Sequence, residues 1–407
     1  MKIDRDRFLE EGYLILPQVI PPGDLECLRA SCEHLLEQQK SAWAQQREPG
    51  DPPGGEWEKS SQPRVMVEQI AAQIDAHSSA AIEIWQHENI QGVSSELLAV
   101  EDAAVTQMMM MCNPVRDYGT CAHNGWHRDV YPPFSAPIQA YAEDIVENAP
   151  RYVQWNIPLY DDDVLWVMPG SHRRLNTREE NEQLRLDSRV PFPGGVQTHL
   201  KAGDGVVYIL PILHWGSNYD ALLRRTLHGG FSTFTQMHDI CYAEHLSAKA
   251  RATFARWNAR SSYLTDLTEA ALRAAIQRHP ARYYDTLEAM HPGRGDKGRA
   301  LTSIYLSKTA RSVRDLLHPD PRSVAQSQRD RAAALHPMTL DWGAGFADRF
   351  SAPEGMAMWE RFQPIDAGLQ AATELAPPAY EKRPSHHYFY DMPEDLDIAG
   401  IIAQWAR

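Results

Sequence analysis

The sequence has few cysteines, and they lack the spacing of a metal or disulfide motif. Its five cysteines are Cys27, Cys32, Cys112, Cys121 and Cys241, an odd number with no Cys-x-x-Cys pair. A disulfide framework or a zinc knuckle needs paired cysteines at short, regular spacing. The pattern therefore predicts reduced thiols in a cytoplasmic protein.

Positive charge and long apolar runs are also scarce. Lys and Arg total 40 against 54 Asp and Glu, a net charge of −14. This balance argues against a nucleic-acid-binding surface and against a basic patch for membranes. No apolar run approaches the roughly 20 residues that span a bilayer, and the charged first eleven residues do not read as a signal peptide. We expect a soluble protein with a small-molecule partner.

The sequence does contain a central region of short apolar or alternating runs. Strands are predicted at 103–112, 151–159, 206–210 and 224–234, with turns rich in Gly, Pro and Asp between them. Many short strands with such turns predict a mainly β core of the double-sheet jelly-roll type shared by cupins. Helices are predicted before this core, and 132–150 is predicted to be a long loop.

The remainder of the chain is predicted to be largely helical, with helices at 242–258, 267–278 and 303–317. We therefore expect a β domain with N-terminal helices over 1–240 and a helical extension over 241–407. The extension either shapes the pocket or contacts another copy of the chain.

Three residues carry the pattern of a metal centre. His127 and Asp129 form a His-x-Asp pair, and His214 follows the strand predicted at 206–210. Two histidines and one carboxylate are the ligand set of non-haem iron, which leaves positions open for a co-substrate and dioxygen. If the first pair lies on a strand, alternation places both side chains on one face while Arg128 points away.

Several stretches, in this order, resemble the phytanoyl-CoA dioxygenase family of iron(II)- and 2-oxoglutarate-dependent oxygenases. They are the N-terminal Phe-Leu-Glu-Glu-Gly-Tyr-Leu-Ile-Leu-Pro run at 8–17, Trp-His-Arg-Asp at 126–129, Pro-Gly-Ser-His at 169–172, Ala-Gly-Asp at 202–204, and the His-x-x-x-Asn pattern at 214–218 followed by Arg-Arg at 224–225. The resemblance covers roughly residues 6–234. It implies a double-stranded β-helix that holds Fe(II) through His127, Asp129 and His214.

The resemblance also implies that 2-oxoglutarate chelates the iron while an arginine after the distal histidine holds its C5 carboxylate. Counting eleven residues from His214 selects Arg225, whereas counting six from Asn218 selects Arg224, and we favour Arg224 because the intervening loop looks one residue shorter. A planar guanidinium pairs a carboxylate through two hydrogen bonds. Alternation would place Thr226 on the face of Arg224, where its hydroxyl could bind the same carboxylate.

Further polar and aromatic side chains are candidates for the same pocket. Gln154 and Asn156 share the polar face of the strand at 151–159, and Gln154 is predicted to lie near 2-oxoglutarate or the substrate. Trp126, Tyr131 and Trp215 flank the predicted ligands and are candidates for the substrate pocket, although aromatic side chains there are equally compatible with packing.

The predicted function is a dioxygenase that hydroxylates an unactivated C–H bond of a small molecule, with dioxygen as co-substrate and succinate and carbon dioxide as co-products. The small molecule could be a specialised metabolite or an amino-acid-like compound. Related halogenases lack the carboxylate ligand, so the presence of Asp129 favours hydroxylation. The alternatives are a metal-dependent cupin-type enzyme that does not use 2-oxoglutarate, and a non-catalytic scaffold of the same fold.

Overall fold

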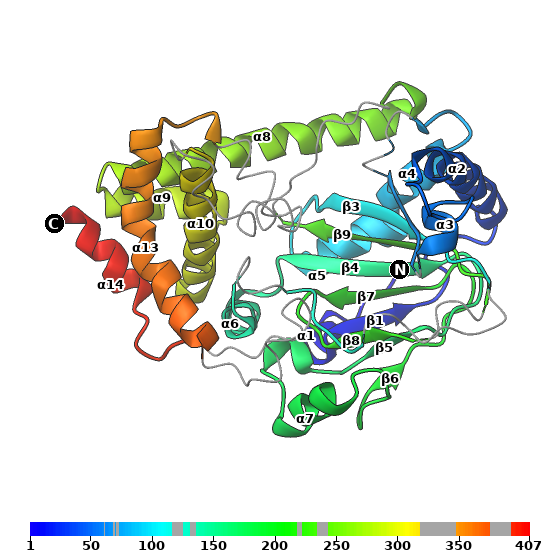
Figure 1. Cartoon of the computed structure of the whole chain (residues 1–407), viewed down its shortest axis with the longest axis horizontal. Coiled ribbons are helices and arrows are strands. Elements are labelled where there is room, and N and C mark those ends of the chain that lie inside the picture. The colour runs from blue at the N-terminus through cyan, green and yellow to red at the C-terminus, as the bar shows by residue number, and fades with distance from the viewer. Residues whose placement is uncertain are drawn as a thin grey trace. The chain divides into compact units, whose positions relative to one another are not determined.

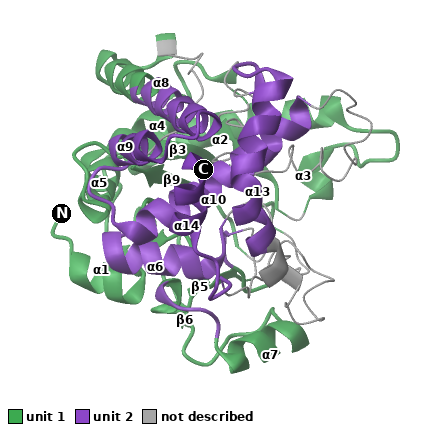
Figure 2. Ribbon diagram, turned by 90° about the vertical axis from the view of Figure 1, so that its left-hand side faces the viewer, with its two compact units in different colours: residues 1–127, 150–172, 177–259 green, residues 128–149, 173–176, 260–407 purple. Residues whose placement is uncertain are grey.

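The chain forms two compact units in a computed structural model (Figure 2). Unit 1 comprises Met1–His127, Pro150–His172 and Thr177–Ala259, and unit 2 comprises Arg128–Ala149, Arg173–Asn176 and Arg260–Arg407. The structure describes residues 1–60, 62–67, 70, 73–115, 125–130, 136–217, 222–233, 243–317, 347–374 and 392–407. The domain boundary predicted between 240 and 241 stays a prediction.

Strands dominate the middle of the described sequence and helices its two ends (Figure 1). The strands are β1 (Tyr13–Leu16), β2 (Arg64–Met66), β3 (Ala104–Met111), β4 (Tyr152–Pro158), β5 (Leu165–Val167), β6 (Val196–Gln197), β7 (Gly205–Ile209), β8 (His214–Gly216) and β9 (Thr226–Ser232). The α-helices are α1 (Arg5–Glu11), α2 (Leu25–Gln46), α3 (Glu56–Lys59), α4 (Ser79–Glu83), α5 (Val93–Leu98), α6 (Ile138–Asn148), α7 (Arg178–Leu186), α8 (Ala248–Ile276), α9 (Pro280–Met290), α10 (Asp296–Leu316), α13 (Ala352–Glu374) and α14 (Ile398–Ala403). Shorter helical turns are η3 (Ile84–Gln86), η4 (Glu88–Gly92), η5 (Ser171–Arg173), η6 (Ala243–His245) and η8 (Gln404–Ala406).

The described strands form two sheets in unit 1. The larger sheet has the order β1-β7-β4-β9-β3-β2 and the smaller has the order β6-β5-β8, and all pairs are antiparallel. From β3 onward the chain passes repeatedly between the sheets, because β4, β7 and β9 join the larger one while β5, β6 and β8 join the smaller. The predicted sheet-rich core is confirmed.

The larger sheet has two chemically different faces, because side chains alternate along each strand. On one face the indole of Trp155 in β4 donates to Ser94 of α5, and Phe231 of β9 contacts Trp85, so N-terminal helical segments cover it. On the other face Tyr208 of β7 packs in one apolar cluster with Val167 of β5. This second face, called the inner face below, therefore looks toward the smaller sheet.

The structure corrects two predicted local structures. Residues 138–148, predicted as part of a loop, form α6, in which Ile138, Tyr141 and Ile145 recur at helical spacing and are buried. The two helices predicted at 242–258 and 267–278 are instead parts of one helix, α8. A loop was predicted here because three prolines, at positions 132, 133 and 137, precede α6, and proline disfavours a helix in the residues before it.

The C-terminal part of the described chain is helical, as predicted. In unit 2, α10 packs against α13 and α6, and a buried ion pair joins Lys308 of α10 to Asp366 of α13 at 2.8 Å. The aromatic rings of Tyr283, Phe362 and Trp405 meet edge-on or tilted, so α9, α13 and η8 share one core. None of the helices in the described ranges is long and apolar enough to cross a membrane.

Candidate metal centre

The segment that carries the first two predicted ligands is fixed by its backbone. His127 and His214 exchange two backbone hydrogen bonds, of 2.8 and 2.9 Å, as an isolated antiparallel bridge. Trp126 N–H donates to Ser188 O at 2.7 Å. A Cβ on Gly125 would lie 2.0 Å from Ser188 Oγ, so only glycine fits this close approach. The described residues 125–130 make only this bridge and no strand, contrary to the prediction.

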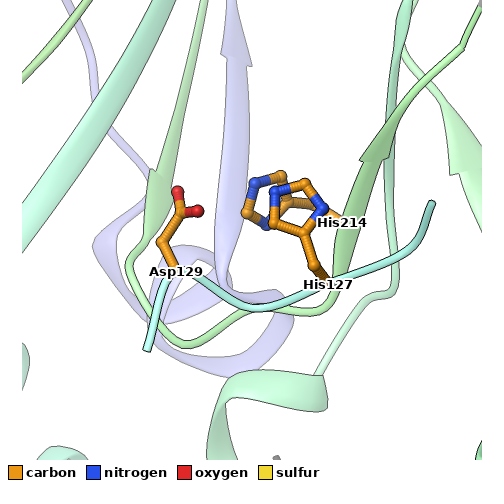
Figure 3. Close-up of side chains that lie close together, drawn as sticks. All are labelled: His127, Asp129 and His214. Atoms are coloured by element: carbon orange, nitrogen blue, oxygen red, sulfur yellow. The ribbon is translucent and has the colours of Figure 1, made fainter. Parts of the chain in front are cut away.

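His127, Asp129 and His214 nevertheless converge. One potential ligand atom from each residue lies within 4.8 Å of the others, and the two imidazole centroids are 4.4 Å apart. Figure 3 shows the Asp129 carboxylate lying across from the two rings. His214 is buried and the other two side chains are half-buried. The three predicted ligands therefore lie close enough together that they could hold one metal ion.

Hydrogen bonds fix which nitrogen of each imidazole is available as a ligand. His127 Nδ1 lies 2.7 Å from Gly125 O, and His214 Nδ1 lies 3.0 Å from Ile212 O. A carbonyl oxygen only accepts, so each Nδ1 carries the proton and donates it. Each Nε2 then keeps its lone pair, as a metal-ligating histidine requires. Two imidazole nitrogens and one carboxylate thus fit the facial ligand set of non-haem iron.

The inner face next to this group carries a hydrogen-bonded chain. The Tyr208 ring centroid lies 5.3 Å from that of His214. The Gln154 amide donates to Tyr208 Oη at 2.9 Å and to His228 Nε2 at 3.0 Å. His228 donates from Nδ1 to Asn156 Oδ1. Gln154 and Asn156 therefore belong to one ordered network that leads from the distal histidine into the sheet.

Arg224 lies on the inner face and is paired with a buried carboxylate. Arg224 Nε donates to Asp162 Oδ2 at 2.8 Å, and its Nη1 lies 3.2 Å from the sulfur of Met111. Thr226 Oγ1 donates to the same Asp162 oxygen at 2.8 Å. Burial alone would raise the pKa of Asp162, but the charge of Arg224 and the hydrogen bonds from Arg224, the Val164 N–H and Thr226 together hold that pKa below its ordinary value.

Arg225 lies on the opposite, helix-covered face. Its Nε and Nη2 donate to the two carboxylate oxygens of Glu33 in α2, at 2.6 and 3.2 Å, so the pair is bidentate. The two arginines directly precede β9, and the hydrogen bond from Leu159 N–H to Arg225 O at 2.8 Å continues the pairing of β9 with β4. Side-chain alternation along this segment then sends the two arginines to different faces. Of the two predicted candidates, only Arg224 shares a face with Thr226 and His228.

The tryptophans predicted to flank the ligands are packed among other aromatic rings. Trp126 stacks on Phe192 at 4.8 Å between centroids, and Trp215 lies between Trp126 and Trp166 at 6.0 and 6.1 Å. Both tryptophans are buried, so their contacts are those of core residues. Tyr131 and Asn218 lie outside the described residues.

Two residues of the inner face were not among the site residues predicted from the sequence. Asp162 lies in an Asp-Asp-Asp stretch that reads as a turn, and Tyr208 lies in an apolar run that reads as a buried strand. The alternation of Val206 and Tyr208 was the available signal for Tyr208. No local signal marks Asp162, because its partner is 62 residues away in the sequence.

Comparison with known families decides the classification. The family model described as phytanoyl-CoA dioxygenase (PhyH) matches residues 8–218, which is more than half of the chain. The chain belongs to the phytanoyl-CoA dioxygenase family. The matched region includes His127, Asp129 and His214, and the resemblance inferred from the sequence is confirmed. No curated protein matches the chain.

Solved structures show more distant likeness. The α-ketoglutarate-dependent epimerase SnoN from nogalamycin biosynthesis is 14% identical, with a TM-score of 0.39 over 56% of this chain and 79% of that one. HygX from Streptomyces hygroscopicus, solved with nickel and 2-oxoglutarate, is 14% identical, with a TM-score of 0.39 over 58% and 90%. EvdO2 from Micromonospora carbonacea var. aurantiaca, complexed with 2-oxoglutarate, is 19% identical, with a TM-score of 0.36 over 61% and 98%. At this level the likeness does not extend to a particular activity.

Proposed function

We propose that the protein is an iron(II)- and 2-oxoglutarate-dependent dioxygenase that hydroxylates an unactivated C–H bond of a small molecule. The observation that carries this proposal is the convergence of His127, Asp129 and His214 within 4.8 Å in a member of the phytanoyl-CoA dioxygenase family. The alternation of the chain between two antiparallel sheets supports a double-stranded β-helix as its scaffold.

In this proposal the three side chains bind Fe(II) through two Nε2 atoms and one carboxylate oxygen. The bound iron supplies the oxidative chemistry, which couples decarboxylation of 2-oxoglutarate to C–H oxidation. The protein orients the ligands through the Nδ1–H bonds to Gly125 and Ile212, and these bonds raise the basicity of each ligating nitrogen. The carboxylate of Asp129 fills the position that a halide would otherwise need, which favours hydroxylation.

Arg224 is the proposed partner of the C5 carboxylate of 2-oxoglutarate. It lies on the inner face, and its side chain is only 4% exposed. A guanidinium carries five N–H donors, so one edge can contact Asp162 while another contacts the co-substrate. The network of Gln154, Tyr208 and His228 lies beside His214 and is the proposed wall of the co-substrate or substrate pocket.

The test is turnover of 2-oxoglutarate by the purified full-length chain with Fe(II) and dioxygen, measured as succinate formed. Wild type is expected to form succinate slowly even without substrate, and Asp129→Ala is expected to form none above background. Screening small molecules for faster succinate formation then identifies the substrate class. Succinate formation unchanged in Asp129→Ala would contradict the proposal.

The two arginines supply a matched pair of variants. Arg224→Gln is expected to weaken 2-oxoglutarate binding and raise its KM, because the C5 carboxylate loses its cation. Arg225→Gln is expected to leave that KM unchanged and to lower stability, since Glu33 of α2 loses its partner. If neither variant changes the KM while metal still binds, the alternative of a metal-dependent enzyme that does not use 2-oxoglutarate is favoured.

A further inference from the structure

Asp162 is held rigidly at the inner face. Its backbone N–H and C=O bond Leu200 in both directions, at 3.0 and 2.9 Å, and its Oδ1 accepts the Val164 N–H at 2.9 Å. Its side chain is 6% exposed. With backbone and side chain both fixed, this carboxylate cannot swing away from Arg224 without breaking several buried hydrogen bonds.

Asp162 Oδ2 accepts hydrogen bonds from the same donors that the carboxylate of a dicarboxylate co-substrate would need. Arg224 Nε and Thr226 Oγ1 both reach Oδ2, each at 2.8 Å. A guanidinium together with a neighbouring hydroxyl is a typical binding arrangement for a carboxylate. In this chain an internal carboxylate already occupies that arrangement, and the Thr226 hydroxyl donates to Asp162.

We propose that Asp162 is a built-in counter-ion that shares Arg224 with 2-oxoglutarate and thereby lowers the affinity and the C5-carboxylate selectivity of the co-substrate site. This inference rests on the proposed function and deepens it. Because Asp162 stays in place, the C5 carboxylate binds a guanidinium whose charge is already offset. The result is a site that fills only at high 2-oxoglutarate concentration, so that activity follows the supply of the co-substrate.

The size of the effect follows from Coulomb's law. Two carboxylates on different edges of one guanidinium lie roughly 6 Å apart, and at an effective dielectric constant of about 20 their repulsion corresponds to a loss of affinity on the order of tenfold to a hundredfold. Removing the charge of Asp162 while keeping its shape should recover that factor. The low pKa of Asp162 means that its carboxylate is charged at neutral pH.

The experiment compares two co-substrates in wild type and Asp162→Asn. 2-Oxopentanoate has the chain length and keto acid of 2-oxoglutarate but lacks the C5 carboxylate. Dissociation constants for both are measured anaerobically with Fe(II) by titrating the visible charge-transfer absorption. Asp162→Asn is expected to bind 2-oxoglutarate about tenfold or more tightly than wild type does, with the affinity for 2-oxopentanoate unchanged.

Equal or weaker binding of 2-oxoglutarate by folded Asp162→Asn would overturn the inference. Wild type gives a second reading that does not depend on folding of the variant. It is expected to prefer 2-oxoglutarate over 2-oxopentanoate by at most about tenfold, because a fully available charged hydrogen-bond donor is worth up to roughly a hundredfold. A larger preference would refute the role of Asp162. No absorption with either keto acid in wild type would instead refute the proposed function.

Discussion

Replacing Asp366 should show how strongly the helices beyond the family match depend on one buried ion pair. Asp366 of α13 is 3% exposed and accepts from Lys308 of α10 at 2.8 Å and from Arg311 at 3.3 Å. Burial lowers the pKa of Lys308, although the Asp366 charge partly restores it. In Asp366→Ala, Lys308 keeps a buried charge that has lost this partner.

The expected loss is about 3–5 kcal/mol at pH 7, the usual cost of removing one partner of a buried ion pair. This loss should lower the thermal unfolding midpoint of unit 2 by roughly 6–20 °C. The pKa of Lys308 would fall further without Asp366. A lysine whose folded-state pKa lies below its unfolded value gains stability as the pH rises between the two values. The deficit of the variant should therefore shrink between pH 7 and pH 9.5.

The assay is thermal unfolding of wild type and Asp366→Ala at both pH values. The matched control is the double variant Lys308→Met with Asp366→Leu, which removes both charges and should cost far less than the single change. A single-variant loss below about 1 kcal/mol, or one that does not depend on pH, would show that the pair is not desolvated as the structure indicates.

Two further predictions concern unit 1. Gly230→Ala should lower the free energy of unfolding strongly, because the new Cβ would lie 2.0 Å from the Tyr152 hydroxyl. Gly23→Ala is the control and should be nearly neutral, because no atom lies within 4 Å of its Cβ. Urea unfolding of the two variants measures the difference. Burial raises the pKa of the Cys112 thiol to about 12. At pH 8 iodoacetamide should therefore modify the exposed Cys27 well before the buried Cys112. Peptide mass spectrometry measures both modifications, and equal rates would refute the prediction.

Much of the fold was predictable because its signals are local. The polar and apolar alternation of β4 and the apolar run of β3 define buried strands, and the structure has them at Tyr152–Pro158 and Ala104–Met111. The helix α6 was missed because the prolines before it resemble a loop. A strand was predicted at His127 because the His-x-Asp spacing fits a strand. The same spacing also fits the irregular segment found here, in which His127 pairs with His214 alone.

The three candidate metal ligands could be chosen from the sequence, but the surroundings of Arg224 could not be predicted from it. A His-x-Asp pair is weak evidence by itself, and one also occurs at 318–320, but the pair at 127–129 and the distant His214 stand in order with the other motifs of the family. The choice between Arg224 and Arg225 depends on which face each occupies, and that follows from the register of β9 with β4. Asp162 could not be predicted, since its pairing with Arg224 arises only when the two sheets come together.

The most direct test of the central claim is anaerobic addition of Fe(II) and 2-oxoglutarate to the purified protein. Chelation of iron by the keto acid at His127, Asp129 and His214 predicts a visible charge-transfer band in wild type that is lost in His127→Ala. Retained folding of the variant, measured by circular dichroism, makes that loss specific to the metal centre. No band in wild type, with iron nevertheless bound, would contradict the account.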